Sequence, residues 1–106
     1  MYYLKKINSN SYKYVYDFYF DDEKIGGFYI DEMDYITFFI NDDKQENGYG
    51  NILFKYILDE LKSIGLKKIY AEVSSDNIKA RKIFSNNKIP DAGVYNDLYQ
   101  YVIFIL

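Results

Sequence analysis

The first part of the chain carries a strand pattern. Four segments are rich in the aromatic and β-branched side chains that favour pleated strands: residues 2–7, 12–20, 25–32 and 34–40. A turn at Asp22-Glu23-Lys24 and another near Met33 separate the last three segments. The pattern therefore predicts an antiparallel meander. Gly26-Gly27 inside one of its strands indicates a bulge or a close approach of two backbones.

The period of the apolar positions changes in the second half. Residues 51–66 predict an amphipathic helix, because apolar side chains recur at spacings of three and four: Ile52, Leu53, Tyr56, Ile57, Leu61 and Ile64. Gly65 is expected as its C-cap. A short apolar strand at residues 67–73 then leads to SSDN, which supplies N-cap residues for a second helix at residues 78–87.

The end of the chain returns to strands. Ile89-Pro90-Asp91 ends the second helix, and residues 93–106 predict two final strands or one long hairpin. The order is an antiparallel meander followed by β-α-β-α-β-β, which is a mixed α/β (α+β) sheet and neither a doubly wound fold nor a barrel. Because a helix that joins neighbouring strands makes a right-handed crossover, we expect residues 34–40 and 67–73 to form a central parallel pair.

Composition narrows the class of protein. The 106 residues are 49% hydrophobic, which is enough for one core and too little for two, so residues 1–106 are predicted to form a single domain. Cysteine and histidine are both absent. Their absence excludes disulfides, Ser-His and Cys-His nucleophiles and nearly all transition-metal sites, so no metal site is predicted. No apolar run approaches the roughly 20 residues of a membrane span and no signal peptide is visible, which favours a cytoplasmic protein.

Charge is unevenly distributed. Between Asp17 and Glu46 there are ten acidic residues and two lysines, whereas the rest of the chain has eleven bases and six acids. Phosphate binding requires clustered Lys and Arg, so nucleic acid is not expected as a direct partner. A cationic partner suits the acidic segment, although the same acids can simply solvate hairpin turns.

Gly48 and Gly50 lie where the last strand of the meander meets the first helix. A helix N-terminus has unpaired N–H groups and a partial positive charge, and glycine leaves room for an anion to approach them. A plain turn is nevertheless the commoner explanation of an isolated Gly-x-Gly. The third glycine of a dinucleotide fingerprint and the lysine and hydroxyl of a P-loop are missing.

The residues around these glycines extend the pattern. The run FFINDDKQENGYGNILFKYIL resembles motif A of the GNAT superfamily of acetyl-CoA-dependent N-acyltransferases, with Gln45, Gly48 and Gly50 in its three defining places. The run VSSDNIKARKIFSNNKI is similar to the family's second motif, V-x-x-x-N-x-x-A-x-x-x-Tyr-x-x-x-Gly-Phe, at four positions: Val73, Asn77, Ala80 and Phe84. The resemblance covers roughly Tyr14 to Leu106 and implies a GNAT-like fold.

The resemblance implies that acetyl-CoA, as a co-substrate, lies between the strand ending at Ile40 and the strand 67–73. The implied contacts are the backbone of Phe38, Phe39 and Ile40 with the pantetheine arm; the amides of Gln45, Glu46, Asn47, Gly48, Tyr49, Gly50 and Asn51 with the pyrophosphate; and Asn77, Lys79, Arg81 and Lys82 with the rest of the cofactor. Asn77 is also a candidate N-cap, and Lys79 and Lys82 are candidates for a solvated helix face.

The chain departs from the family pattern in two ways. Phe84 stands where the family often has a Tyr that protonates the leaving thiolate, and Lys88 and Ile89 replace the usual Gly-Phe. In addition, there is no room after the first strand for the one or two helices that usually help to form the acceptor site. An unusually open acceptor side is therefore expected.

The sequence indicates the catalytic residues less directly than the cofactor contacts. An acceptor amine with a pKa near 10.4 costs about 4.6 kcal/mol to deprotonate at pH 7, so a base is needed. Without histidine we expect Asp34 first, because some protein-acetylating members of the family keep a Glu near that place; Glu32, Asp31 and Glu72 are alternatives, and each can equally be a solvent-facing acid. Tyr101 is the first choice for a general acid among Tyr49, Tyr95, Tyr99 and Tyr101, unless the thiolate leaves unprotonated.

Three functions remain open at this point. The first is an acetyl-CoA-dependent N-acetyltransferase that acts on a primary amine, with a protein lysine favoured over a small molecule because of the open acceptor side. The second is a catalytically reduced module of the same fold that binds CoA or a protein partner. The third is a β-rich partner subunit in which the apolar segment YQYVIFIL pairs across a homodimer.

Overall fold

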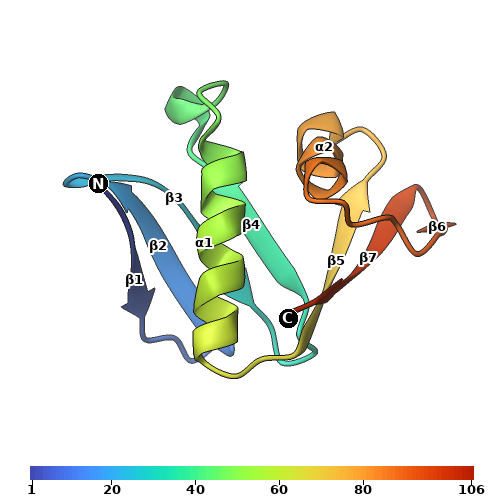
Figure 1. Ribbon diagram of the computed structural model, residues 1–106, viewed down its shortest axis with the longest axis horizontal. Helices are drawn as coiled ribbons and strands as arrows, with labels where there is room; N and C mark the ends of the chain where they lie inside the picture. Colours follow the sequence, from blue (N-terminus) through green and yellow to red (C-terminus); the bar gives the residue numbers. More distant parts are fainter.

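A computed structural model describes all 106 residues and confirms the predicted order of elements (Figure 1). The first half contains β1 (Tyr2–Ile7), β2 (Tyr14–Phe20), β3 (Glu23–Ile30), β4 (Ile36–Ile40) and the 3₁₀ turn η1 (Asp42–Lys44). The second half contains α1 (Tyr49–Ser63), β5 (Lys68–Ser74), α2 (Ile78–Asn86), β6 (Val94–Tyr95) and β7 (Leu98–Phe104). The final segment is thus a short hairpin. Neither helix combines the length and the apolar character that spanning a membrane demands.

The strands form two sheets, in the orders β1-β2-β3-β4 and β5-β7-β6, and all pairs within them are antiparallel. The expected parallel neighbours, β4 and β5, meet at a single bridge between Tyr35 and Tyr70, where the Tyr70 amide donates to the Asp34 carbonyl at 2.8 Å. Beyond the bridge the two strands diverge (Figure 1). The ring of Phe38 on β4 lies 5.9 Å from the ring of Phe84 on α2.

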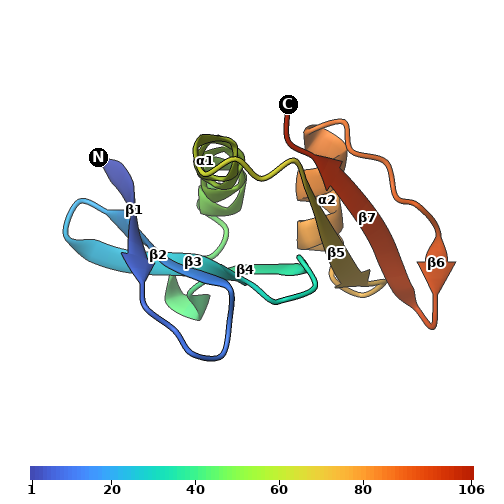
Figure 2. The same ribbon diagram turned by 90° about the horizontal axis from the view of Figure 1, so that it is seen from below.

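One hydrophobic cluster of 17 buried residues joins the sheets and helices. Helix α1 covers one face of the four-stranded sheet, and no α-helix covers the other face (Figure 2). Helix α2 packs on β7 through Phe84, whose ring stacks on Tyr101 at 4.1 Å. The absence of a helix on the second face agrees with the lack of sequence between β1 and β2 for one.

Gly26 and Gly27 serve both predicted purposes. The register between β2 and β3 shifts next to Gly26, which is a bulge at Ile25. A Cβ atom on Gly26 would collide with the Phe39 carbonyl oxygen, and one on Gly27 would lie 2.6 Å from the Tyr16 carbonyl oxygen. The predicted turn was misplaced by one residue: it lies at Asp21-Asp22, and Glu23 already belongs to β3.

The two helices end in the same way. Gly65 follows α1 with φ +84°, its amide donates to Lys62 O and the Leu66 amide donates to Leu61 O, which is a Schellman motif. Lys88 takes the same place after α2 with φ +59°, and the Ile89 amide donates to Phe84 O. Helix α1 begins two residues earlier than predicted, so that Gly50 lies in its first turn.

The apolar C-terminal strand β7 lies at the edge of its sheet over only part of its length. Strand β5 pairs with all of it, whereas β6 pairs only with Leu98 and Tyr99. The edge of β7 is therefore open over its last residues, and homodimer pairing along that edge stays a prediction.

Candidate cofactor site

A cavity of about 400 Å³ lies between the end of β4, the start of α1 and one face of α2. Eleven of the residues predicted to contact the cofactor line it: Phe38, Phe39, Ile40, Gln45, Glu46, Gly48, Tyr49, Gly50, Asn51, Asn77 and Lys79. The structure therefore brings the two sequence motifs together around one space. Lys82, a further candidate for contact with the cofactor, also lines the cavity.

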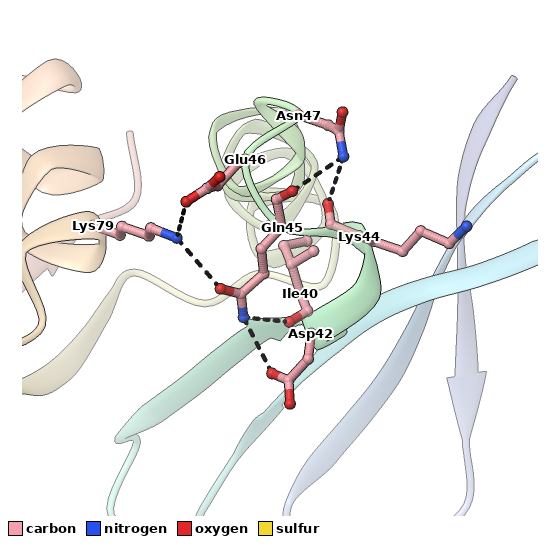
Figure 3. A network of polar contacts seen from close by, with 7 residues as sticks. All are labelled: Ile40, Asp42, Lys44, Gln45, Glu46, Asn47 and Lys79. Atoms are coloured by element: carbon pink, nitrogen blue, oxygen red, sulfur yellow. Dashed lines mark hydrogen bonds and ion pairs between the residues drawn. The ribbon is translucent and has the colours of Figure 1, made fainter.

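Two predicted contacts lie elsewhere. The Asn47 side chain donates to the carbonyl oxygens of Lys44 and Gln45, both at 3.1 Å, and so braces the loop (Figure 3). Arg81 projects from the opposite face of α2, where its guanidinium donates to Ser75 O at 3.0 Å. Helical spacing explains the difference, because residues 79, 80, 82, 83 and 86 share the cavity side and residue 81 does not. The same spacing, counted from Asn77, would have added Ile83 and Asn86, which the motif did not include.

Gln45 fixes the loop to the end of β4. Its Nε2 donates to the Ile40 carbonyl at 3.2 Å and to Asp42 Oδ1 at 3.4 Å (Figure 3). Its Oε1 faces Lys79 Nζ of α2 at 3.5 Å. A single side chain thus links the strand, the loop and the second helix.

The start of α1 is open toward the cavity. Gly48 is the N-cap residue in a left-handed conformation (φ +76°), and it makes no side-chain cap. The amides of Tyr49, Gly50 and Asn51 have no acceptor in the protein, since the first helical bond runs from Ile52 N to Gly48 O. Three unpaired amides at the positive end of a helix form a site for an anion.

The absence of a side chain at Gly50 affects the packing of the two helices as well as the access of a ligand. A Cβ atom there would lie 2.9 Å from Ile83 Cδ1 of α2. The missing side chain therefore lets the two helices approach each other above the cavity. The second helix is capped differently, because Asn77 Oδ1 accepts from the Ala80 amide at 3.1 Å, so Asn77 is both an N-cap and a cavity residue.

The charges around the cavity favour an anion. Lys44, Lys79 and Lys82 line it together with one carboxylate, Glu46. Lys79 Nζ lies 3.3 Å from Glu46 Oε1, and both residues line the cavity (Figure 3). Lys44 pairs with Glu23 at 3.0 Å, and this hydrogen bond raises the pKa of the lysine. Lys82 forms no ion pair.

Strand β4 offers its backbone to the same space. It pairs with β3 on one edge, whereas beyond the Tyr35–Tyr70 bridge its other edge has no partner strand. The free N–H and C=O groups of that edge can bind an extended ligand as a neighbouring strand would.

The three predicted catalytic residues do not line the cavity. Asp34 lies at the closed end between the sheets, six residues and about 20 Å of strand before Ile40. Its Oδ1 is bound by Lys13 Nζ at 2.8 Å, which raises the pKa of the lysine and occupies the carboxylate. Glu32 is exposed in the turn before β4.

Tyr101 is 5% exposed, and burial raises the pKa of its hydroxyl. It lines a second cavity on the far side of α2, together with Tyr99. Tyr95 is exposed on β6. Tyr49 alone of the four tyrosines lines the first cavity, and Phe84 is fully buried among Phe38, Phe54 and Tyr101.

Glu72 lies beside the opening between the sheets. Glu72 follows the bridge residue Tyr70 by two positions on β5, and it is exposed on the strand face opposite the buried residues Ala71 and Val73. Its Oε2 accepts a hydrogen bond from Gln100 Nε2 at 3.0 Å, and it forms no ion pair. Glu72 does not line the cavity either, but its carboxylate forms no ion pair and it lies on β5 two residues beyond the bridge, where the two strands diverge.

Comparisons with known proteins agree with this geometry. Residues 2–86 match the family model described as the acetyltransferase (GNAT) family. No curated protein matches the sequence significantly.

Solved structures with the same fold are distant in sequence. A mutant form of the spermidine/spermine N-acetyltransferase SpeG from Vibrio cholerae is 18% identical with a TM-score of 0.78, over 90% of this chain and 68% of that one. Spermidine N-acetyltransferase from Vibrio cholerae in complex with CoA and spermine is 19% identical with a TM-score of 0.76, over 87% and 65%. The ribosomal L7/L12 alpha-N-protein acetyltransferase RimL in complex with coenzyme A is 15% identical with a TM-score of 0.77, over 89% and 63%. The chain thus spans about two thirds of the length of these neighbours.

Proposed function

This chain belongs to the GNAT family of acetyl-CoA-dependent N-acetyltransferases, and we propose that it transfers the acetyl group of acetyl-CoA directly to a primary amine. One observation carries the proposal. The unpaired amides of Tyr49, Gly50 and Asn51 and a surplus of lysines line a cavity that adjoins the free edge of β4. Phosphates need the first two features and a pantetheine arm needs the third.

The residues around the cavity fit the cosubstrate. The α1 amides face the place where a pyrophosphate would lie, and Lys79 and Lys82 supply cationic side chains from α2. The backbone of Phe38 to Ile40 would hold the pantetheine arm, because this edge of β4 has no partner strand and its N–H and C=O groups are free. The whole chain, residues 1–106, is proposed to be one acetyltransferase domain, and its cysteine-free composition fits a cytoplasmic enzyme.

We assign the general base to Glu72 in place of Asp34. The Glu72 carboxylate accepts one proton of the acceptor ammonium, and the neutral nitrogen then attacks the thioester carbonyl. The C–S bond breaks to expel the CoA thiolate, and the nitrogen releases its second proton to solvent as the amide forms. Asp34 is occupied by Lys13 and suits a structural role. Phe84 has no hydroxyl, so the thiolate leaves without a tyrosine proton donor, which a thiol pKa near 8.5 allows.

The proposed acceptor is a lysine on a protein. Its support is the face of the sheets that no helix covers, which leaves the approach to Glu72 open to a large substrate (Figure 2). The spermidine N-acetyltransferase neighbour was solved with spermine, so a polyamine is the competing acceptor to be tested beside it.

The test is incubation with labelled acetyl-CoA and three acceptors: a lysine-rich protein, spermine and the same protein with its lysines blocked. Label in the unblocked protein above that in spermine supports the proposal; label in spermine alone would refute the protein acceptor. Glu72→Gln should lose at least tenfold in rate at neutral pH, whereas Asp34→Asn should keep most activity because Asn tolerates the left-handed φ of +67° found there. The opposite pattern would restore Asp34 as the base.

The second candidate function is a protein that binds the cofactor at the same site and does not catalyse acetyl transfer. The buried phenyl ring of Phe84, where the family often has a hydroxyl, favours a module that binds CoA without transfer. Titration calorimetry separates the two, since binding of acetyl-CoA without transfer to any amine would support the module. Gly48→Glu should abolish binding under both proposals, while Gly48→Asn, which is neutral and tolerates φ +76°, is the control.

A further inference from the structure

A second cavity, of about 420 Å³, lies on the opposite side of α2 from the cofactor site. It is bounded by the outer face of α2, the segment after that helix, and β7. Three charged side chains line it, namely Arg81, Lys88 and Asp91, together with the rings of Tyr99 and Tyr101. The net charge of the lining is therefore positive by one.

Arg81 is the single arginine in a chain whose other twelve basic residues are lysines. Its guanidinium carbon lies 3.9 Å from the centre of the Tyr99 ring, and one nitrogen donates to Ser75 O at 3.0 Å. It is half-buried and forms no ion pair with any carboxylate of the protein. These contacts hold the planar group in place while leaving most of its five donors free, which is the state that favours bidentate binding of a carboxylate.

Lys88 is held at a place that disfavours lysine. It takes the left-handed position after α2 with φ +59°, which is the position that Gly65 takes after α1. A residue with a Cβ atom is strained in that conformation and glycine is not. The lysine brings a second cationic side chain to the cavity that Arg81 lines. Attraction to the carbonyl end of α2 is the alternative reason for a lysine there.

We propose that this cavity binds the carboxylate of a small organic acid, held between Arg81 and Lys88 with the Tyr101 hydroxyl as a further donor. Burial raises the pKa of Tyr101, so the hydroxyl keeps its proton at neutral pH. Asp91 contributes a negative charge at the rim, which disfavours a dianion such as phosphate relative to a monocarboxylate. The carboxylate can come from a free acid or from the C-terminus of a peptide.

The site is separate from the cofactor cavity and does not depend on the proposed acetyl transfer. The two cavities share no lining residue, and Phe84 lies between them, packed against Phe38 on one side and Tyr101 on the other. Its test accordingly uses binding in the absence of CoA and of any amine.

The probes are N-acetylglycine for a free acid, an N-acetylated tripeptide with a free C-terminus for a chain end, and N-acetylglycinamide as the uncharged control. Binding is followed by the NMR shift of the Arg81 Nε–H signal during titration. We expect saturable shifts with one or both carboxylates and none with the amide. The carboxylate that binds shows whether the site accepts a free acid, a peptide C-terminus or both. Equal binding of the amide, or no shift with either acid, would overturn the proposal.

Variants separate a ligand role from a structural one. Arg81→Gln should weaken carboxylate binding by about tenfold or more, because it removes the charged fork. Its binding is followed by calorimetry in place of the missing Arg81 signal. Lys88→Gly should raise the melting temperature by a few degrees through release of the strained φ and yet weaken carboxylate binding several-fold.

Gly65→Lys is the matched control, because it places a lysine at the equivalent position of α1, away from the cavity. It should lower the melting temperature and leave carboxylate binding unchanged. Unaltered binding in both Lys88→Gly and Arg81→Gln would refute the site.

Discussion

Replacing Glu46 by Gln should tighten the binding of CoA. Glu46 is the one carboxylate that lines the cofactor cavity, and its Oε1 lies 3.3 Å from Lys79 Nζ. A phosphate that enters must compete with Glu46 for this lysine and also meets its negative charge. Gln has nearly the same shape, so the substitution removes the charge and leaves the loop in place.

The expected size follows from the exposure of the pair. The side chains of Lys79 and Glu46 are 64% and 79% exposed, and such surface pairs contribute about 0.2–1 kcal/mol. Repulsion of a phosphate charge about 7 Å away in water adds about 0.6 kcal/mol. Loss of both terms should lower the Kd of CoA by about 4- to 15-fold at low salt. At 1 M salt, where the screening length is about 3 Å, most of the gain should disappear.

Titration calorimetry with CoA and with pantetheine measures the effect. Pantetheine carries no phosphate, so its affinity should be the same for Glu46→Gln and the unaltered protein. Lys79→Gln should act in the opposite direction on CoA alone. An unchanged or weaker affinity for CoA in Glu46→Gln at low salt, or an equal gain for pantetheine, would refute the reasoning.

Three further predictions concern stability. Tyr16 is 3% exposed, and Tyr16→Phe removes the 2.7 Å hydrogen bond from its hydroxyl to Glu60. The change should cost about 1–3 kcal/mol, a drop of at least 4 °C in melting temperature, while Tyr19→Phe on the uncovered face should change little. Burial and the Glu60 hydrogen bond raise the pKa of Tyr16 above its usual 10, so the unfolded chain loses this proton first and the free energy of unfolding should fall as pH rises above 10. That slope, measured by urea denaturation, should shrink in Tyr16→Phe. Gly26→Ala should cost about 3 kcal/mol or more, because its Cβ would collide with the Phe39 carbonyl; a variant as stable as the parent would contradict the close approach.

Local periodicity was sufficient to predict the elements, because each is encoded within a few residues. The spacing of Ile52, Leu53 and Ile57 defines α1, and Asn77 caps α2 as its side chain suggests. The gap between the sheets is a long-range property. No local pattern indicates that β4 and β5 pair at one bridge only, because the two strands belong to different sheets and are separated in sequence by α1.

Most residues that line the first cavity could be predicted as a set, because the motif fixes backbone positions at one junction; their contacts with acetyl-CoA stay a prediction. The catalytic residues were not, since their roles depend on pairing that the sequence hides. Asp34 is a plausible base in the sequence, but in the structure its Oδ1 is paired with Lys13, which is distant in the sequence. Arg81 lies away from the first cavity because the basic residues of α2 do not share one helix face: Lys79 and Lys82 line that cavity, and Arg81 lines the other.

The single bridge between the sheets also shapes how the molecule assembles. Strands β1 to β4 pair in chain order within residues 2–40, so this sheet closes over short loops and can form quickly, whereas β5 pairs with β7 only across the longer connection that contains α2 and β6. The cavity exists only where these two units dock. A local opening at the seam would remove it while both sheets stay folded, and faster hydrogen exchange of the Tyr70 amide than of the neighbouring β5 amides would report that opening.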